Sequence, residues 1–293
     1  MNFTDNQIKA RRFTFSGHES FPCKSLWLKK GYDFVCQEKN FNSPDSVINL
    51  GVGKNMVSSI RYWLKAFGIY NTDGKLTDIG KYLFNEESGK DKYLEDLATL
   101  WLLHYNIVSL QEATLYHMLF CGVQRERSQF EREQVVTYAK LRMAEAGKQK
   151  LFNENTVKKD AAVLLQNYTL PRKAQSNEDY SSLLMDLDLI RQNAEGKGYY
   201  FNIEGKRMVT KEVFMYGLLK LKGDDNTIPY ETIKQELGLL FCMNDAETIE
   251  MLKSLSTKYS QHMAYSDVAG IRQVQFTQSM DPFKVLDDYY ENI

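Results

Sequence analysis

One segment, Leu50 to Gly68, constrains the fold of this chain more than any other. Its large apolar side chains recur at steps of four, four and three residues, at Met56, Ile60, Leu64 and Phe67. This spacing places them on one face of an α-helix, and the glycine that follows them is typical of a helix C-terminus. The segment therefore predicts an amphipathic helix whose apolar face packs against the rest of the protein.

The opposite face of this predicted helix is polar and basic, and it contains no acidic residue. Its members are Ser58, Arg61, Tyr62 and Lys65, with Lys54 and Asn55 at the leading end. The guanidinium of Arg61 can donate two hydrogen bonds to guanine, and the amide of Asn55 can pair with adenine. The other four side chains are suited to phosphate contacts. We therefore predict that this face binds DNA.

A turn sequence, Asn71 to Gly74, follows the helix and lies between two short apolar segments. An Asp-Gly pair in this position favours a β-hairpin, and a further helix is expected to start near Thr77. A short helix, a turn, a second helix and a small hairpin, in this order, are typical of a winged helix-turn-helix. The stretch from Lys54 to Lys65 is then the candidate recognition helix.

Two later regions show the same order of elements less clearly. The first combines predicted helices and a hairpin over residues 156–168, about 179–191, and 196–203. The second combines them over residues 230–237, 244–258 and around 268–270. Three more helical patterns lie between the first two modules and predict a helical bundle, over residues 93–108, 111–120 and 129–146.

These patterns predict a mainly α protein with small β-hairpins, in which several winged helix-turn-helix-like modules surround a helical bundle. The expected segments are an N-terminal DNA-binding module, the bundle, a second module and a C-terminal module, over residues 1–90, 91–150, 151–222 and 223–293. The C-terminal module ends in a tail, residues 281–293, that carries four acids and one base. We expect this tail to be solvated or to dock onto a basic surface.

Charge along the chain separates possible DNA surfaces from other surfaces. The 37 Lys and Arg residues nearly balance the 38 Asp and Glu residues, which excludes a uniformly basic protein. Residues 1–30, which include Lys29 and Lys30, nevertheless carry a net charge of +4, and residues 206–222 carry +4 as well. Such local excess is what phosphate binding needs. The helix over 244–258 is acidic, so we expect the C-terminal module to bind protein or to be structural.

Cysteine usage and hydropathy indicate the compartment. The four cysteines form no Cys-x-x-Cys pair, and the first residues contain no apolar leader. No apolar run is long enough to span a bilayer. We therefore expect a reduced, cytoplasmic protein that has no membrane partner.

Candidate catalytic residues are few. His18 and Glu19 are adjacent within Phe15 to Pro22, and they suggest a general-base pair or metal ligands. The alternative is a structural histidine that is hydrogen-bonded in a turn or contacts DNA. Since no third ligand accompanies them, we predict no metal site, and a divalent ion such as Mg²⁺ is expected only if the protein nicks DNA.

Two other motifs match known sites only loosely. Glu204-Gly-Lys206 with Asp188 upstream resembles the carboxylate and lysine pattern of metal-dependent nucleases, but it is equally consistent with a turn after a hairpin. The segment Gly51 to Lys54 lacks the spacing of a phosphate-binding P-loop, and Asn55 replaces its Ser or Thr. We therefore do not predict nucleotide binding.

Several long strings of the sequence resemble one family. These strings are residues 15–31, 50–64, 93–104 and 265–272. They are similar to the bacterial family catalogued as domain of unknown function 4007. The resemblance extends over nearly the whole chain, but it identifies no catalytic residue. His18 and Glu19 lie within the first string and are the candidates that it offers.

The resemblance implies a component of bacterial DNA phosphorothioation and phage-defence loci, encoded beside sulfur-transfer and ATPase proteins. The B component of the Ssp-type system looks like this family, and that component nicks DNA at the site to be modified. On this basis we expect a DNA-binding, strand-nicking subunit whose partners are DNA and proteins of the same locus. The alternative is a DNA-binding regulator or scaffold that has no catalytic activity of its own.

Overall fold

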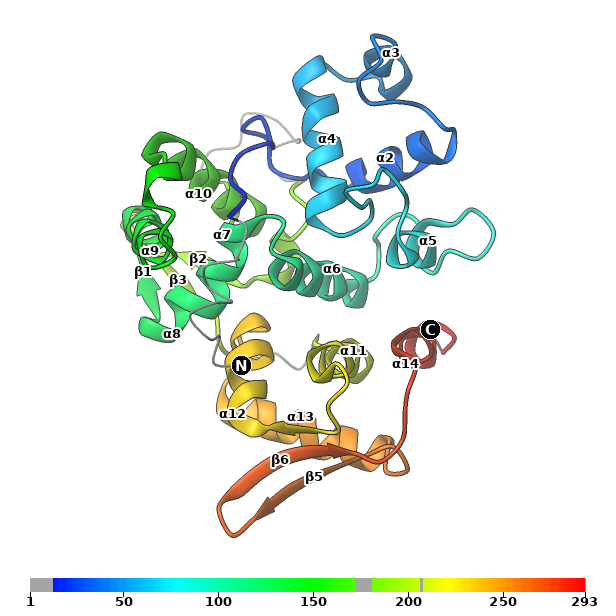
Figure 1. Cartoon of the computed structure of the whole chain (residues 1–293), viewed down its shortest axis with the longest axis vertical. Helices are drawn as coiled ribbons and strands as arrows, with labels where there is room; N and C mark the ends of the chain where they lie inside the picture. The colour runs from blue at the N-terminus through cyan, green and yellow to red at the C-terminus, as the bar shows by residue number, and fades with distance from the viewer. Residues whose placement is uncertain (1–12, 172–180, 206–207, 293) are drawn as a thin grey trace. The chain divides into compact units, whose positions relative to one another are not determined.

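A computed structural model describes residues 13–171, 181–205 and 208–292 of the chain. The chain divides into two compact units, Asn2–Phe201 and Asn202–Ile293, called here the N-terminal unit and the C-terminal unit. The four segments expected from the sequence are a finer division, which stays a prediction. Both units are mainly helical, and each contains a small antiparallel sheet (Figure 1).

The first part of the N-terminal unit contains the helix that the sequence singled out. Its helices are α2 (Trp27–Cys36), α3 (Ser46–Leu50), α4 (Lys54–Ala66) and α5 (Asp78–Phe84). Beyond α4 the chain turns at Gly68, where φ is +74°, and Tyr70 then forms a β-bridge with Leu76. Thr77 caps α5 by accepting a hydrogen bond from the backbone N–H of Gly80. The predicted amphipathic helix, turn and following helix are confirmed, and their assignment as a winged helix-turn-helix stays a prediction.

A group of helices follows in the same unit. They are α6 (Leu97–Leu110), α7 (Thr114–His117), the π-helical turn η1 (Met118–Val123), α8 (Gln124–Glu126), α9 (Arg132–Glu145), the 3₁₀ turn η2 (Gln149–Leu151) and α10 (Glu154–Tyr168). Helix α6 is buried over most of its circumference, as its nearly continuous apolar sequence requires. His104 on α6 is fully buried, and its Nδ1 lies 2.8 Å from the hydroxyl of Tyr168.

The predicted helix over residues 179–191 is wrong. Residues 179–180 lie outside the described residues, and the rest forms a short 3₁₀ turn, η4 (Met185–Leu187), followed by strand β2 (Ile190–Gln192). Asp188 has a left-handed backbone, with φ +47°, which ends any helix there. Buried Met185, Leu187 and Leu189 alternate with exposed Asp186 and Asp188, a period of two that is typical of extended chain and not of a helix.

Strand β2 belongs to a three-stranded antiparallel sheet whose order is β1-β3-β2. Strand β1 (Gln129–Phe130) and strand β3 (Tyr199–Phe201) complete it. Tyr200 of β3 is paired with Gln129 on one side and with Arg191 on the other. The hairpin predicted near residues 196–203 is therefore present, and it recruits a third strand from a distant part of the chain.

The C-terminal unit contains three longer helices and one sheet. Its elements are α11 (Lys211–Lys222), β4 (Thr227–Pro229), α12 (Tyr230–Ile233), the π-helical turn η6 (Lys234–Gly238), α13 (Asp245–Lys258), β5 (Met263–Val268), β6 (Ile271–Phe276) and α14 (Pro282–Tyr290). The sheet order is β4-β6-β5, and Ala269 and Gly270 form the tight turn of the hairpin with positive φ. The predicted helices and hairpin of this region are confirmed.

The acidic tail is not simply solvated. Pro282–Tyr290 forms helix α14, and Asp281 caps it by accepting a hydrogen bond from the N–H of Phe283 at 2.9 Å. Val285, Leu286 and Tyr290 are buried, and α14 packs against α11. The acids therefore lie on the outer side of a docked amphipathic helix, because the apolar residues recur at helical spacing.

Two further observations concern the whole described chain. No helix in the described residues is long and apolar enough to cross a membrane. All four cysteines are free thiols, of which Cys36 is exposed and the other three are buried.

Candidate nucleic-acid interface

Five of the predicted DNA-binding residues lie together on the outer side of α4. They are Lys54, Asn55, Ser58, Arg61 and Lys65, called here the α4 face. Lys54, Asn55 and Ser58 are exposed, and Arg61 and Lys65 are partly exposed. None of the three bases is in an ion pair with a described residue. The α4 face is thus a row of unneutralised positive charges, which is what a phosphate backbone requires.

Neutral contacts hold the two inner bases in place. Arg61 donates a hydrogen bond from Nη1 to Oδ1 of Asn42 at 3.0 Å. The ammonium of Lys65 lies 5.9 Å from the centre of the Tyr70 ring, a cation–π contact. These contacts orient both side chains and leave their positive charges uncompensated. The helix therefore presents Arg61 and Lys65 in a defined position to an anion.

The N-terminus of α4 adds a feature that the sequence analysis did not identify. Its N-cap is Gly53, so no side chain accepts hydrogen bonds from the free N–H groups of the first turn. A Cβ on Gly51 or Gly53 would meet no atom within 4 Å, so the loop is open. Lys30 lies at the same end, where its Nζ donates to the carbonyl of Leu50 at 3.1 Å. This end of α4 combines a positive helix dipole with nearby ammonium groups.

The signal for this helix end was present in the sequence. Gly51 and Gly53 lie just before Lys54, and a glycine before the first helical residue is the signal for an open helix end. A glycine at the N-cap leaves the helix end unprotected, whereas Ser, Thr, Asp or Asn would have capped it. The same glycines that fail the P-loop pattern therefore leave the first-turn N–H groups of α4 without a side-chain acceptor.

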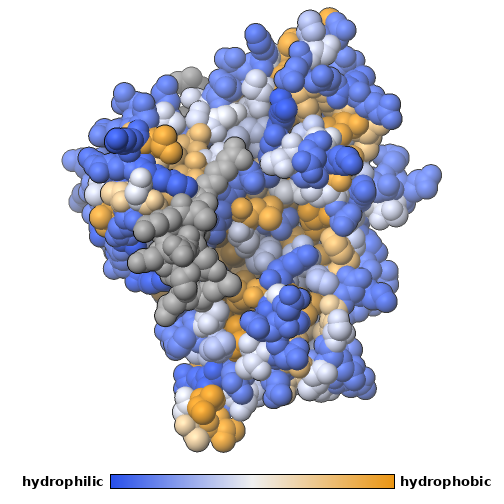
Figure 2. Space-filling view, viewed as in Figure 1, coloured by the Kyte–Doolittle hydropathy of each residue, from blue (hydrophilic) through white to orange (hydrophobic). Residues whose placement is uncertain are grey.

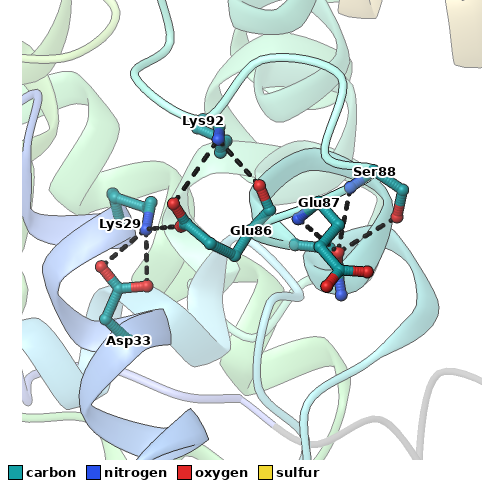
Figure 3. A network of polar contacts seen from close by, with 7 residues as sticks. Lys29, Asp33, Glu86, Glu87, Ser88 and Lys92 are labelled. Atoms are coloured by element: carbon teal, nitrogen blue, oxygen red, sulfur yellow. Dashed lines mark hydrogen bonds and ion pairs between the residues drawn. The ribbon is translucent and has the colours of Figure 1, made fainter.

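Lys29, which lies in the basic N-terminal segment predicted to bind DNA, is buried in an ion-pair network. It is 8% exposed, and its Nζ lies 2.6 and 2.7 Å from the two carboxylate oxygens of Asp33. Glu86 approaches the same Nζ at 3.5 Å, and Lys92 pairs with Glu86 on its other side at 3.7 Å (Figure 3). Lys29 thus joins α2 to the loop after α5 within a network of four charges.

Electrostatics explain why Lys29 stays charged in this position. Burial by itself lowers the pKa of the ammonium, but the hydrogen bond to Asp33 and the charges of Asp33 and Glu86 outweigh it. The net effect is a pKa above the ordinary value for lysine. A lysine that is neutralised by two carboxylates adds little attraction for DNA. Its neighbour Lys30 is exposed and stays a candidate.

Tyr62 is turned toward the interior of the N-terminal unit. Its ring contacts His18 and Trp63 edge-on, with centroid distances of 5.7 and 4.9 Å. A Cβ on Gly17 would lie 2.6 Å from the Tyr62 ring, so only glycine allows this approach. Burial, followed by the negative charges of Asp160 and Glu112, raises the pKa of the Tyr62 phenol above its ordinary value. Tyr62 therefore positions α4 and does not extend the α4 face.

The structure pairs His18 with Asp160 and not with Glu19. His18 is 4% exposed, and its Nε2 lies 2.8 Å from Oδ1 of Asp160 on α10. The backbone N–H of Ser20 donates to Nδ1 at 3.1 Å, so Nδ1 is an acceptor and Nε2 carries the proton. Both ring nitrogens of His18 are therefore hydrogen-bonded within the N-terminal unit.

Both carboxylate oxygens of Asp160 accept hydrogen bonds from the loop that carries His18. Its Oδ2 accepts a hydrogen bond from the backbone N–H of Ser16 at 2.8 Å. Ser16, Gly17, Glu19 and Ser20 all have positive φ, and the Glu19 side chain points to solvent. Such a run of left-handed residues is kept only where the surroundings determine it. The loop is a clasp between α4 and α10, called here the His18 clasp.

The loose nuclease pattern gains no support from the structure. Asp188 is engaged by Arg191, whose Nε donates to both carboxylate oxygens at 2.9 and 3.1 Å. Lys206 lies outside the described residues. Within the described part of the chain, no three His, Cys, Asp or Glu side chains gather closely enough to hold a metal ion. The chemistry that the geometry supports is therefore anion binding at α4.

Comparisons with known proteins identify one family and two similar folds. A family model described as "Protein of unknown function (DUF4007)" matches residues 15–290. The structure is similar to a magnesium ion-bound SspB crystal structure and to a second SspB crystal structure, with TM-scores of 0.82 and 0.83. In both cases the identity is 24%, and the match covers 97% of this chain and 90% of the other. Among curated proteins, none matches.

Proposed function

The chain belongs to the family of proteins of unknown function DUF4007, and on this premise we propose that it is a DNA-binding component of a bacterial DNA phosphorothioation and phage-defence system. One observation carries the DNA-binding part of the proposal. The α4 face presents three bases and no acid, and it begins at an uncapped helix N-terminus. A surface of this kind suits the sugar-phosphate backbone of DNA, since it offers positive charge and free N–H donors together.

The contacts follow from the positions of the side chains. The first-turn N–H groups of α4, with Lys54 and Lys30, are placed to hold one phosphate group. Arg61 lies two helical turns further on, where its guanidinium can reach a base edge or the next phosphate. Asn55 and Ser58 offer neutral donors and acceptors between these charges. In this arrangement α4 is the recognition helix of a DNA-binding module.

The fold supports the assignment to a phosphorothioation system. Two crystal structures named SspB share the fold over 97% of this chain. The strings that resemble the family point to the same kind of locus, in which sulfur-transfer and ATPase proteins are encoded together. We therefore propose that the partners of this protein are DNA and proteins of that locus.

Strand nicking is the activity that the resemblance adds to DNA binding. The hydrogen bonds at both ring nitrogens of His18 support a structural role for this residue more than the role of a general base. Magnesium appears in the name of one structural neighbour, but the described residues do not form a three-ligand site. Mg²⁺ often takes only one or two carboxylates together with substrate phosphates. A Mg²⁺ site of that kind is completed by the phosphates of the DNA, so nicking must be assayed with both DNA and Mg²⁺ present.

The second candidate is a DNA-binding regulator or scaffold without catalytic activity. The observation in its favour is that His18, the histidine of the family-like first string, has a purely structural role in the His18 clasp. Both candidates require the α4 face, and they differ only in whether the phosphodiester backbone is cut.

A single set of measurements tests the proposal and separates its two forms. Purified protein is titrated onto duplex DNA and, in parallel, incubated with supercoiled plasmid and Mg²⁺ or Mn²⁺. Saturable, salt-dependent binding with relaxed circles supports a nicking subunit, and binding with intact supercoils supports a regulator or scaffold. If the protein binds no duplex at low salt, the DNA-binding proposal fails in both forms.

A further inference from the structure

The C-terminal unit contains a groove of about 290 Å³ between the beginning of α11 and the outer side of α13. Its apolar lining includes Val209, Met243 and Met251, of which Met251 is partly exposed. Met208, which directly precedes the groove in the chain, is 61% exposed. All the lining residues belong to the C-terminal unit, so the groove, called here the α11–α13 groove, is a property of this unit alone.

The other exposed apolar surface of this unit is different in shape. Val268 and Ile271 project from the end of the β5–β6 hairpin, which is the orange tip at the bottom of Figure 2. A protruding tip has no surrounding walls or polar groups that would make it selective for one ligand. The α11–α13 groove is concave and is lined by side chains of defined charge, which makes it the better binding surface.

Charge around the groove is unevenly placed. Glu247 and Glu250 lie on the α13 side, and Lys211 lies on the α11 side. Glu247 is partly used by the helix, since its Oε2 accepts a hydrogen bond from the N–H of Asn244 at 3.3 Å. Glu250 is exposed. The α13 side of the groove therefore offers a negative charge next to methionine side chains.

The charge of the whole unit has the same sign. The C-terminal unit contains 14 acids and 10 bases, a net charge of −4, whereas the N-terminal unit contains 24 acids and 27 bases, a net charge of +3. The α13 side of the groove shares this negative sign, whereas residues 206–222, the segment that contains α11, carry a net charge of +4. The exposed carboxylate of Glu250 therefore favours a basic group at the α13 side of the groove.

The size and lining of the groove narrow the choice of occupant. Its volume is at the lower end for ligand sites, so it accommodates one large apolar side chain. Methionine side chains are flexible and adapt to different apolar partners. We propose that the α11–α13 groove binds a basic protein segment, which inserts one large apolar side chain between Met243 and Met251 and places a lysine or arginine beside Glu250.

The proposal is tested on the full chain with a phage library of random peptides of about twelve residues, a length that spans a helical or extended recognition segment. The expected consensus is one large apolar residue flanked by lysine or arginine. Binding of the selected peptide is then measured by fluorescence anisotropy. Met251→Asp and Glu250→Lys are each expected to weaken it by at least about tenfold.

Controls separate the groove from general charge and from the DNA site. Lys253→Glu, on α13 but outside the groove, should change the affinity by less than about threefold. Met251→Ala serves if Met251→Asp does not fold, and it should also weaken binding. Duplex DNA should not displace the peptide, and a variant that has lost the α4 charges should still bind it. An acidic consensus, the absence of any enriched sequence, or unchanged affinity in the groove variants would overturn the proposal.

Discussion

Helices α4 and α13 have similar lengths and opposite surfaces. Each follows a short helix and precedes antiparallel β pairing, and each packs an apolar side against its own unit. Helix α4 carries three bases and no acid, whereas α13 carries Asp245, Glu247 and Glu250 with only two lysines. The same order of elements thus carries two helix surfaces of opposite charge.

The N-termini of the two helices also differ, since that of α4 is uncapped and that of α13 is capped by its own side chains. Gly53 leaves the first turn of α4 without a side-chain cap. Asn244 and Glu247 form a capping box on α13, in which the Asn244 side chain accepts from the N–H of Glu247 at 2.9 Å. In α13 the Asn244 side chain and the Glu247 carboxylate already accept hydrogen bonds from N–H groups at the helix N-terminus, so these groups are not available to an external anion. The N-terminal cap, as well as the charge of the exposed face, therefore makes α4 a better surface for phosphate than α13.

The largest expected effect comes from removing the support of α4. Asp160→Ala leaves the N–H of Ser16 and the ring of His18 without their buried acceptor. We expect the free energy of unfolding of the N-terminal unit to fall by about 3 kcal/mol, measured by chemical denaturation. Glu19→Ala in the same loop is the matched control and should cost less than about 0.5 kcal/mol. The reverse order of these two effects would show that His18 depends on Glu19 after all.

The next effect is obtained by giving α4 the charge of α13. Arg61→Glu combined with Lys65→Glu should weaken duplex binding by about 100-fold, which corresponds to about 2.7 kcal/mol. Lys253→Glu makes α13 more acidic and should leave DNA binding within about twofold. Fluorescence anisotropy at a fixed salt concentration measures both. Equal losses from the two helices would mean that net charge, and not the α4 face, determines binding.

A neutral substitution gives a smaller effect with a more specific signature. Arg61→Ala combined with Lys65→Ala should weaken binding by about tenfold. Each lost phosphate contact lowers the slope of log K against log salt by about one, so the slope should fall by about two. A salt titration of both proteins measures this slope. If affinity and slope are unchanged, DNA binds elsewhere, and the segment over 206–222 is the next candidate.

The smallest effect tests the helix cap. Gly53→Asp gives α4 a carboxylate cap of its own, and the open space around Gly53 accepts the new side chain. Stability should rise by a few tenths of a kcal/mol, while DNA binding should weaken by about fivefold, because the carboxylate competes with phosphate for the same N–H groups. Gly53→Asn caps the helix without charge and should weaken binding less. Thermal melts and anisotropy provide the two measurements, and equal affinity in all three proteins would exclude the helix end from the interface.

Local patterns predicted the helices and turns better than the roles of single side chains. The spacing of apolar residues identified α4 and α13, and the Asp-Gly turn and the C-terminal hairpin were found from residue types alone. The prediction over 179–191 failed because buried Met185, Leu187 and Leu189 alternate with exposed Asp186 and Asp188. A period of two indicates a strand and not a helix.

The candidate site residues also divide into those that local spacing could predict and those that depend on distant contacts. Lys54, Asn55, Ser58, Arg61 and Lys65 share one helix, so their common face could be predicted from their spacing. Lys29 pairs with Asp33 one turn further along α2, which helical spacing could have indicated, whereas Glu86 reaches it only because the chain returns after α5. His18 was assigned to its neighbour Glu19, whereas its partner Asp160 is 142 residues away. Nothing in the local sequence indicates such a pairing.

Spacing and charge within one or two helical turns were enough to predict most of the helices, and which of them is basic and which is acidic, but they misplaced a helix over residues 179–191. Which charges stay unneutralised depends on the tertiary structure. Long-range contacts bury Lys29, turn Tyr62 toward His18, pair His18 with Asp160 and place Val209 beside Met243 and Met251 in one groove. Burial and the partner it supplies depend on residues that are distant along the chain, and they determine whether a side chain is available to a ligand.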